Sequence, residues 1–200
     1  MNFLAVLDYE HLDNGMFLTA FARSLAQKKE SGIIIHSDSE YTDRLIQTGM
    51  MREDARLRAI KDLNHRLIAL FADQGVSTIG VNGYQKSLIQ IKDDQIYINR
   101  DQVHRFPSQP MLLISGLAED LSSKSPTALS LPDMALSFQN HFNINEITLF
   151  SMDESSSFIK GDFPMDIIPS EKDQDFLEKH IPKSFRGFNK KVKLSTPDTF

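Results

Sequence analysis

Cysteine is absent from the 200-residue chain, and this absence removes several kinds of chemistry at once. It excludes disulfide bonds, thiolate nucleophiles and zinc–cysteine sites, and it agrees with a reducing compartment. The six histidines are scattered without the spacing of metal ligands, so we expect no metal site. The sequence therefore favours neither a metalloenzyme nor a cysteine-dependent enzyme.

Basic charge and long apolar runs are also scarce. The formal net charge of −5 argues against non-specific binding of nucleic acid. The opening segment 1–8 has no basic residue, and its apolar run is too short for a signal peptide or a membrane span. We therefore expect a cytoplasmic protein that has neither a nucleic-acid partner nor a membrane partner.

What the chain does contain is an alternation of short β-branched runs with helical patterns. The predicted strands are 3–7, 33–36, 76–80, 111–115 and 146–150, and the predicted helices are 16–27, 40–47, 52–73, 132–141 and 171–180. This alternation predicts an α/β fold, namely a three-layer α/β/α sandwich with a mainly parallel sheet. A hairpin at 88–98 is expected to cover a cleft as a lid. We interpret 117–130 and 154–157 as loops and 186–193 as a basic tail.

A buried strand that leads directly into a helix is predicted at 32–46. The free N–H groups and the dipole at such a helix start can hold an anion such as phosphate. The turn, however, contains Ser37, Asp38 and Ser39 in place of glycine, and Asp38 adds negative charge. Two interpretations stay open: an anion site, or a turn in which Asp38 or Ser39 caps the helix.

The longest helical pattern, at 52–73, has last turns that are apolar on nearly every face. A helix of this kind is usually covered on more than one side. The pattern fits a homodimer built through 52–73, and it fits equally well a helix buried within its own subunit.

Two segments carry a resemblance to a known family. Residues 63–70 are similar to the Val-Asn-Lys-Glu-Leu-Val-Ala-Leu helix of the amino acid kinase family, and residues 80–89 are similar to its Gly-Leu-Asn-Gly-Lys-Asp-Gly-Gly-Leu-Ile segment. The order and spacing of the elements resemble that family over nearly the whole chain, and acetylglutamate kinase most closely. The resemblance implies one domain with a substrate-side lobe at 1–125 and a shortened nucleotide-side lobe at 126–200.

In that family, a lysine and glycines in the first two turns hold the ATP phosphates, a second lysine neutralises the transferring phosphoryl group, and an aspartate positions both lysines. The resemblance places Val6 at the first lysine and Asp8 and Tyr9 at two glycines. Of the family's His-Gly-Gly-Gly turn, only His36 is retained. Losing the cation and the open backbone removes most of such catalysis, which consists of positioning and charge stabilisation.

The later motifs are kept in part. Residues 129–134 align with Asn-x-Asn-Ala-Asp-Thr and retain Asp133, and residues 186–192 align with Gly-Gly-Met-x-x-Lys-Val and retain Lys191. Asp133 also has a simpler interpretation, as a first-turn acid that interacts with the helix dipole. The candidate ligand-binding residues are His36, Ser37, Ser39, Arg52, Asn82 and Gly83.

Two functions follow as hypotheses. The first is an acetylglutamate-kinase-like protein that has lost ATP-dependent phosphoryl transfer and needs no cofactor. It binds a small molecule, such as an anionic metabolite, or another subunit. The alternative is an active kinase that phosphorylates the carboxylate of an N-acylated amino acid, as in arginine biosynthesis. In that case ATP and Mg²⁺ are the cofactors, Asp133 is the organiser and Lys191 the charge stabiliser. Storage or sensing of another oxyanion in the same cleft is a third option, which rests on fold analogy.

Overall fold

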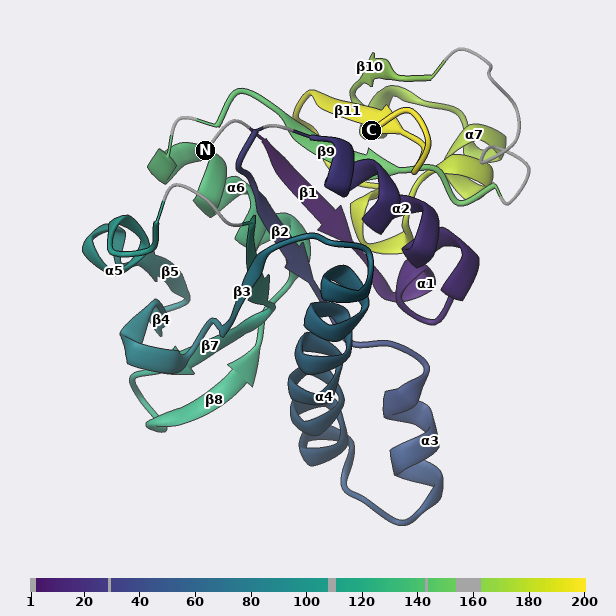
Figure 1. Ribbon diagram of the computed structural model, residues 1–200. Coiled ribbons are helices and arrows are strands. Elements are labelled where there is room, and N and C mark those ends of the chain that lie inside the picture. Colours follow the sequence, from purple (N-terminus) through teal and green to yellow (C-terminus); the bar gives the residue numbers. More distant parts are fainter. Residues whose placement is uncertain (1–2, 29, 108–110, 143, 154–162) are drawn as a thin grey trace.

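A seven-stranded sheet forms the centre of the protein (Figure 1). The computed structural model describes residues 3–28, 30–107, 111–142, 144–153 and 163–200. The strand order is β10-β11-β9-β1-β2-β6-β3, and every neighbouring pair is parallel except β10 with β11. The strands are β1 (Leu4–Leu7), β2 (Ile33–His36), β3 (Thr78–Asn82), β6 (Met111–Ser115), β9 (Ile147–Phe150), β10 (Met165–Ile167) and β11 (Val192–Ser195). This confirms the α/β fold with a mainly parallel sheet.

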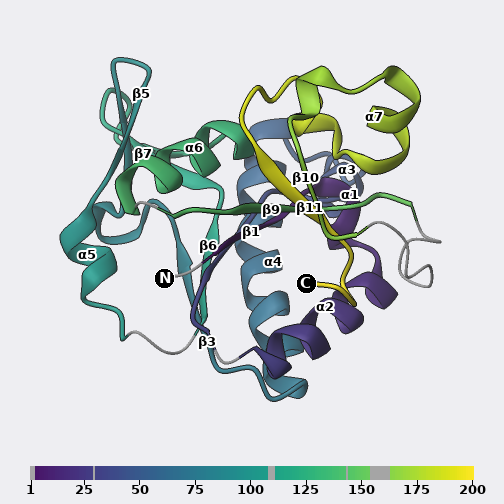
Figure 2. The ribbon, with the colours of Figure 1, turned by 90° about the horizontal axis from the view of Figure 1, so that it is seen from above.

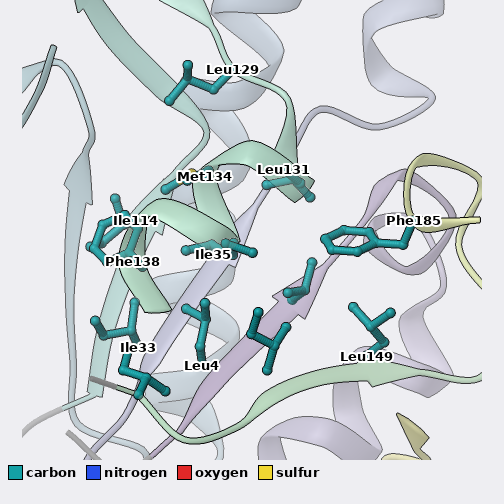
Figure 3. Close-up of a cluster of buried hydrophobic side chains, with 14 of the residues drawn as sticks. Leu4, Ile33, Ile35, Ile114, Leu129, Leu131, Met134, Phe138, Leu149 and Phe185 are labelled. Carbon is teal, nitrogen blue, oxygen red and sulfur yellow. The ribbon is translucent and has the colours of Figure 1, made fainter. Parts of the chain in front are cut away.

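Helices cover both faces of this sheet, as Figure 2 shows. One face packs against α2 (Gly15–Gln27) and α4 (Arg52–Asp73), and the other packs against α6 (Leu131–Phe142). Alternate residues of β1 point to opposite faces: Leu4 and Val6 belong to the core under α6 (Figure 3), whereas Ala5 and Leu7 belong to the core under α2. Both faces are therefore buried, which explains the nearly continuous apolar strands in the sequence.

A second sheet of four strands lies beside the first, in the order β5-β4-β7-β8. Its strands are β4 (Ile89–Lys92), β5 (Gln95–Ile98), β7 (Leu117–Asp120) and β8 (Ser125–Ala128), and α5 (Arg100–His104) follows β5. The predicted hairpin at 88–98 is confirmed as β4 and β5, while its role as a lid stays a prediction. The prediction of a loop at 117–130 is wrong, because β7 pairs with β4 and forms a hairpin with β8.

The C-terminal segment also differs from the expected basic tail. Strand β11 lies inside the main sheet between β9 and β10, with Val192 and Leu194 buried. Before it come η3 (Pro169–Glu171), α7 (Gln174–His180) and η4 (Lys183–Phe185). Helix α7 begins three residues later than 171, because Asp173 caps it by accepting a hydrogen bond from the Phe176 N–H. The loop predicted at 154–157 lies outside the described residues.

Helix α4 has the predicted bounds, and its apolar end is largely covered by its own subunit. Leu67 and Phe71 are buried in the core under α2, and Ile68 and Leu70 pack against the same core. The N-terminal half of α4 packs against α3 (Tyr41–Gln47), and the two helices project together from the sheet (Figure 1). None of the helices in the described ranges is both long and apolar enough to cross a membrane. The homodimer through 52–73 and the division into lobes at residue 125 stay predictions.

Candidate functional site

The carboxyl ends of β1 and β9 mark the point where the chain changes direction across the sheet. From β1 the chain moves to β2 on one side, and it returns later as β9 on the other side. Parallel sheets usually bind ligands at such a switch point. A groove of about 1080 Å³ opens there, lined by residues that follow β1, β2, β9 and β11 and by the first turns of α2. This groove is the candidate functional site.

The turn after β1 is filled by the carboxylate of Asp8. Asp8 is only 4% exposed, and it caps the short helix α1 (Tyr9–Leu12). Its Oδ1 accepts hydrogen bonds from the Tyr9 N–H at 2.8 Å and from Ser37 Oγ at 3.1 Å, and its Oδ2 accepts one from Ser184 Oγ. Asp8 therefore joins β1 to the turn after β2 and to η4, and both of its oxygens are occupied by donors from the protein.

His11 forms part of the groove and completes the cap of α1. Its Nδ1 accepts a hydrogen bond from the Asp8 N–H at 3.2 Å, and its Nε2 lies 3.2 Å from the carbonyl oxygen of Phe150, to which it donates. The ring stacks on Phe17 with centroids 4.5 Å apart. Burial lowers the pKa of His11 to about 4, so the imidazole is neutral at physiological pH. The capping pattern, with Asp8 at the N-cap and His11 three residues later, was the sequence signal that could have revealed this pair.

The turn after β2 also uses its polar groups locally. His36 is fully buried with Nδ1 2.9 Å from the Ser37 carbonyl oxygen, and burial lowers its pKa to about 4. Ser39 Oγ accepts a hydrogen bond from the Tyr41 N–H at 3.2 Å. Asp38 Oδ2 accepts from Thr42 Oγ1 at 3.3 Å and lies 3.3 Å from Arg56 Nε. Ser39 thus supports the start of α3 although Glu40 occupies the N-cap position.

Tyr9, the second residue placed at a family glycine, reaches from α1 to α3. Its hydroxyl donates a hydrogen bond to Asp43 Oδ2 at 2.8 Å. Burial, followed by the hydrogen bond and charge of Asp43, raises the pKa of Tyr9 above its ordinary value. The phenol is therefore a neutral donor that ties these two helices together.

Asn82 and Gly83 lie at the end of β3, the edge strand of the sheet. Asn82 Oδ1 accepts hydrogen bonds from Ser115 Oγ at 3.0 Å and from Asn64 Nδ2 at 3.4 Å. A Cβ atom on Gly83 would lie 2.0 Å from the Leu117 carbonyl oxygen, so only glycine fits there. These contacts join β3 to β6, α4 and β7, and a ligand-binding role for either residue stays a prediction.

The remaining predicted residues lie apart from one another. Asp133 is exposed in the first turn of α6. Lys191 forms an ion pair with Asp166 across β10 and β11 at 2.7 Å, and both side chains are largely exposed. Arg52 is 75% exposed and lies 4.0 Å from Asp43. Among the residues that the structure describes, no ion pair joins Asp133 to Lys191. Their catalytic roles stay predictions.

Carboxylates dominate the groove. It is lined by one guanidinium, that of Arg23, and by five carboxylates, those of Glu10, Asp13, Glu40, Asp153 and Asp198. Asp13 pairs with Arg44 at 3.2 Å and Asp153 pairs with Lys179 at 3.2 Å. Glu10 Oε2 and Asp13 Oδ2 are buried without a hydrogen-bond partner among the described residues. The groove therefore carries a negative potential that opposes the binding of a polyphosphate.

No cluster of three or more metal-ligating side chains that could hold a metal ion occurs in the described ranges. The carboxylates of the groove are thus arranged without the geometry of a metal centre. The expectations for cofactors, namely none or, in the kinase alternative, ATP and Mg²⁺, stay predictions.

Comparison with known proteins supports the fold. No family model and no curated protein matches the sequence. Among solved structures, isopentenyl phosphate kinase is similar with a TM-score of 0.56 and 11% identity over 76% of this chain and 72% of that chain. Aspartate kinase from Synechocystis has a TM-score of 0.62 and 11% identity over 76% of this chain and 28% of that chain.

A third similar structure aligns with nearly the whole chain. N-acetylglutamate synthase from Neisseria gonorrhoeae, solved with coenzyme A and N-acetyl-glutamate, has a TM-score of 0.62 and 15% identity over 98% of this chain and 54% of that chain. This chain therefore spans about half of the synthase and a smaller part of the aspartate kinase. At these identities the likeness concerns the fold, which this chain shares with proteins of the amino acid kinase family.

Proposed function

We propose that this protein is an amino-acid-kinase-like protein that has lost phosphoryl transfer and acts by binding a small molecule or another subunit. The observation that carries this proposal is the occupied turn after β1. Asp8 fills it with a buried carboxylate that accepts hydrogen bonds from Ser37 and Ser184. A phosphate held by glycine N–H groups needs this turn to be open and free of negative charge.

The position of Val6 supports the same conclusion. The resemblance gives this position to the lysine that binds the ATP phosphates, yet Val6 is 1% exposed and packs in the core under α6. A lysine ammonium there would have no water around it, and a valine supplies no charge. Phosphoryl transfer depends on cations near the transferring group, so this substitution removes a principal contribution to catalysis.

The charge of the groove adds a further obstacle to ATP. Each carboxylate about 4 Å from a phosphate oxygen costs roughly 1 kcal/mol in water and about 4 kcal/mol at an effective dielectric constant near 20. For exposed groups such as Glu40 and Asp198, the repulsion is close to the lower of these two values because salt screens their charge. Mg²⁺ opposes this repulsion by bridging carboxylate and phosphate, so the test must include it.

Thermal unfolding with and without ligands tests the proposal. A ligand at 100 times its Kd stabilises the folded state by about 2.7 kcal/mol, which raises Tm by several degrees. We expect millimolar MgATP to raise Tm no more than Mg²⁺ alone, and we expect no acyl phosphate from N-acetylglutamate and MgATP. A rise of several degrees together with acid-labile phosphate would overturn the proposal and make Asp133 and Lys191 the catalytic candidates.

A homodimer through 52–73 belongs to the same proposal. Leu57 on α4 is only partly buried in the isolated subunit, and Ala69 is exposed. Each Leu or Phe side chain buried in a dimer would contribute about 1.5–3 kcal/mol. Sedimentation at micromolar concentration should show a dimer, and a monomer there would rule this part of the proposal out.

A further inference from the structure

A second pocket, at the opposite edge of the main sheet from β10, has a different charge from the groove. It is lined by side chains of η1 (Gln85–Ser87), which follows β3, and of α5 and the two residues after it. The pocket has a volume of about 590 Å³, and its lining residues are Lys86, Ser87, Gln102, Arg105 and Phe106. We propose that it binds a small organic anion, with the phosphate or carboxylate group between Lys86 and Arg105 and the apolar part against Phe106.

The two cations of this pocket, Lys86 and Arg105, have no ion-pair partner in the part of the chain that the structure describes. One acid, Glu119, is hydrogen-bonded to a residue of the pocket lining. Its Oε2 accepts from Ser87 Oγ at 3.1 Å and from Gln90 Nε2 at 2.9 Å, so this oxygen is already bonded by two donors. Two cations against this one acid leave the pocket with an excess of positive charge for a ligand.

The pocket walls are fixed to one another before any ligand arrives. Leu88, which follows η1, is 1% exposed, and its carbonyl oxygen accepts a hydrogen bond from the Asn99 N–H at 2.9 Å. Asn99 in turn caps α5 through the Gln102 N–H at 3.2 Å. Val103 anchors α5 in the core. A pocket formed in advance loses less entropy when it binds a ligand than a flexible surface does.

The side chains present suit an anion with an apolar part. Arginine can donate two parallel hydrogen bonds to a carboxylate or phosphate, and lysine adds a compact charge. Gln102 and Ser87 add neutral polar groups, and Phe106 provides an apolar surface. Small-molecule sites commonly combine such an apolar wall with a few convergent polar groups in a volume of ~300–1,000 Å³. The competing explanation is that Lys86 and Arg105 are only solvated, with Arg105 stabilising the C-terminal end of α5.

Nuclear magnetic resonance titration distinguishes these explanations. The probes are phenyl phosphate, benzoate and inorganic phosphate, with benzamide as the uncharged control. We expect saturable shifts of the backbone amides of residues 85–88 and 102–106 with phenyl phosphate or benzoate, weaker binding of inorganic phosphate, and no saturation with benzamide. The stronger of the first two probes identifies the preferred anionic group.

A charge-matched pair of variants completes the test. K86Q/R105Q should weaken binding by at least about tenfold, because two charge-assisted contacts are lost. K92Q/R100Q removes the same net charge from exposed positions that do not line the pocket, and it should bind as the wild type does. Equal weakening in both variants, shifts that never saturate at 50 mM probe, or unchanged binding in K86Q/R105Q would each overturn the proposal. The result does not depend on whether the groove binds ATP.

Discussion

The groove beside Asp8 and the pocket beside Lys86 both lie where strands of the main sheet end, yet they carry opposite charge. The groove has five carboxylates and one guanidinium, whereas the pocket has two cations and no carboxylate in its lining. The groove also rests on buried polar groups that are bonded to one another, including Asp8 and His11. The fold alone would predict a phosphate site at the switch point, whereas the charges favour an anion at the other edge.

This difference shows that topology and charge give separate information about a site. Topology decides where a concave surface forms, because the loops that follow β1 and β9 run in opposite directions across the sheet and a groove lies between them. The side chains decide which ligand that surface accepts. In the first turn, Asp8 stands at a position that the resemblance gives to glycine, and its carboxylate takes up hydrogen-bond donors of this turn while the parallel sheet is kept.

The largest effect that we predict concerns the pH dependence of stability and two buried histidines. His11 and His36 have pKa values lowered from 6.5 to about 4 by burial. Below pH 6.5 the unfolded chain binds protons that the folded chain does not, so stability is fully present above pH 6.5 and falls as the pH drops toward 4. Urea unfolding should show a loss of about 4 kcal/mol from these two groups between pH 7.5 and pH 5.

Variants separate the histidine contribution to the pH-dependent loss of stability from the contribution of the carboxylates. H11Q should remove about half of the predicted pH-dependent loss, roughly 2 kcal/mol, whatever its effect on stability at pH 7.5. Equal pH dependence in wild type and H11Q would show that His11 is not held neutral by burial.

The fold could be predicted where one face or both faces of a strand are uniformly apolar. Runs such as Ile33–Ile35 identify buried parallel strands directly. Strand β11 was missed because Lys193 alternates with buried Val192 and Leu194, and the lysines around it suggested a tail. Lys193 reaches Glu146 at 2.8 Å, a contact that the sequence pattern does not reveal. Strands β7 and β8 were missed because their polar residues are typical of loops.

For the site, the sequence could identify single unusual residues but not the contacts that these residues make with distant segments. The sequence identified Asp8 as a departure from the family pattern, but it gave no sign that Ser184, 176 positions away, would bond to it. Similarly, nothing in the sequence indicated that Asn82 would accept a hydrogen bond from Ser115 or that Gly83 would lie against the Leu117 backbone, and a ligand-binding role for either residue stays a prediction. Contacts between distant segments depend on the packing of the whole sheet, which local patterns do not contain.

The next largest effect should follow from removing the charge of Asp8. D8N keeps the shape of the side chain but replaces one carboxylate oxygen by an NH2 group that cannot accept, so at least one of the donors of Tyr9, Ser37 and Ser184 is left without an acceptor. We expect a loss of about 1–3 kcal/mol in the free energy of unfolding. The matched variant D198N, at an exposed position in the same groove, should change it by less than about 0.5 kcal/mol. An unchanged free energy of unfolding in D8N would mean that the carboxylate is not needed for stability, and the turn would again be a candidate ligand site.

The smallest effect that we predict comes from a variant that separates two obstacles to polyphosphate binding in the groove, namely its negative charge and the filled Asp8 turn. E40K/D198K reverses two exposed charges there but leaves the Asp8 turn filled. An exposed pair at about 4 Å contributes roughly 1 kcal/mol in water, but salt screens such exposed charges to about a quarter of this value. We therefore expect the reversal of both charges to make pyrophosphate bind the groove only about fivefold more tightly.

Amide shifts of residues 13–16 in the groove report this binding separately from any binding at Lys86. E53K/D54K makes the same change of net charge at exposed positions at the start of α4 and should leave the groove unchanged. An equal gain in that control would assign the effect to overall charge. A gain of a hundredfold or more in E40K/D198K would mean that charge alone excludes polyphosphate and that the Asp8 turn does not block it, since a filled turn would still limit the contact between phosphate and backbone.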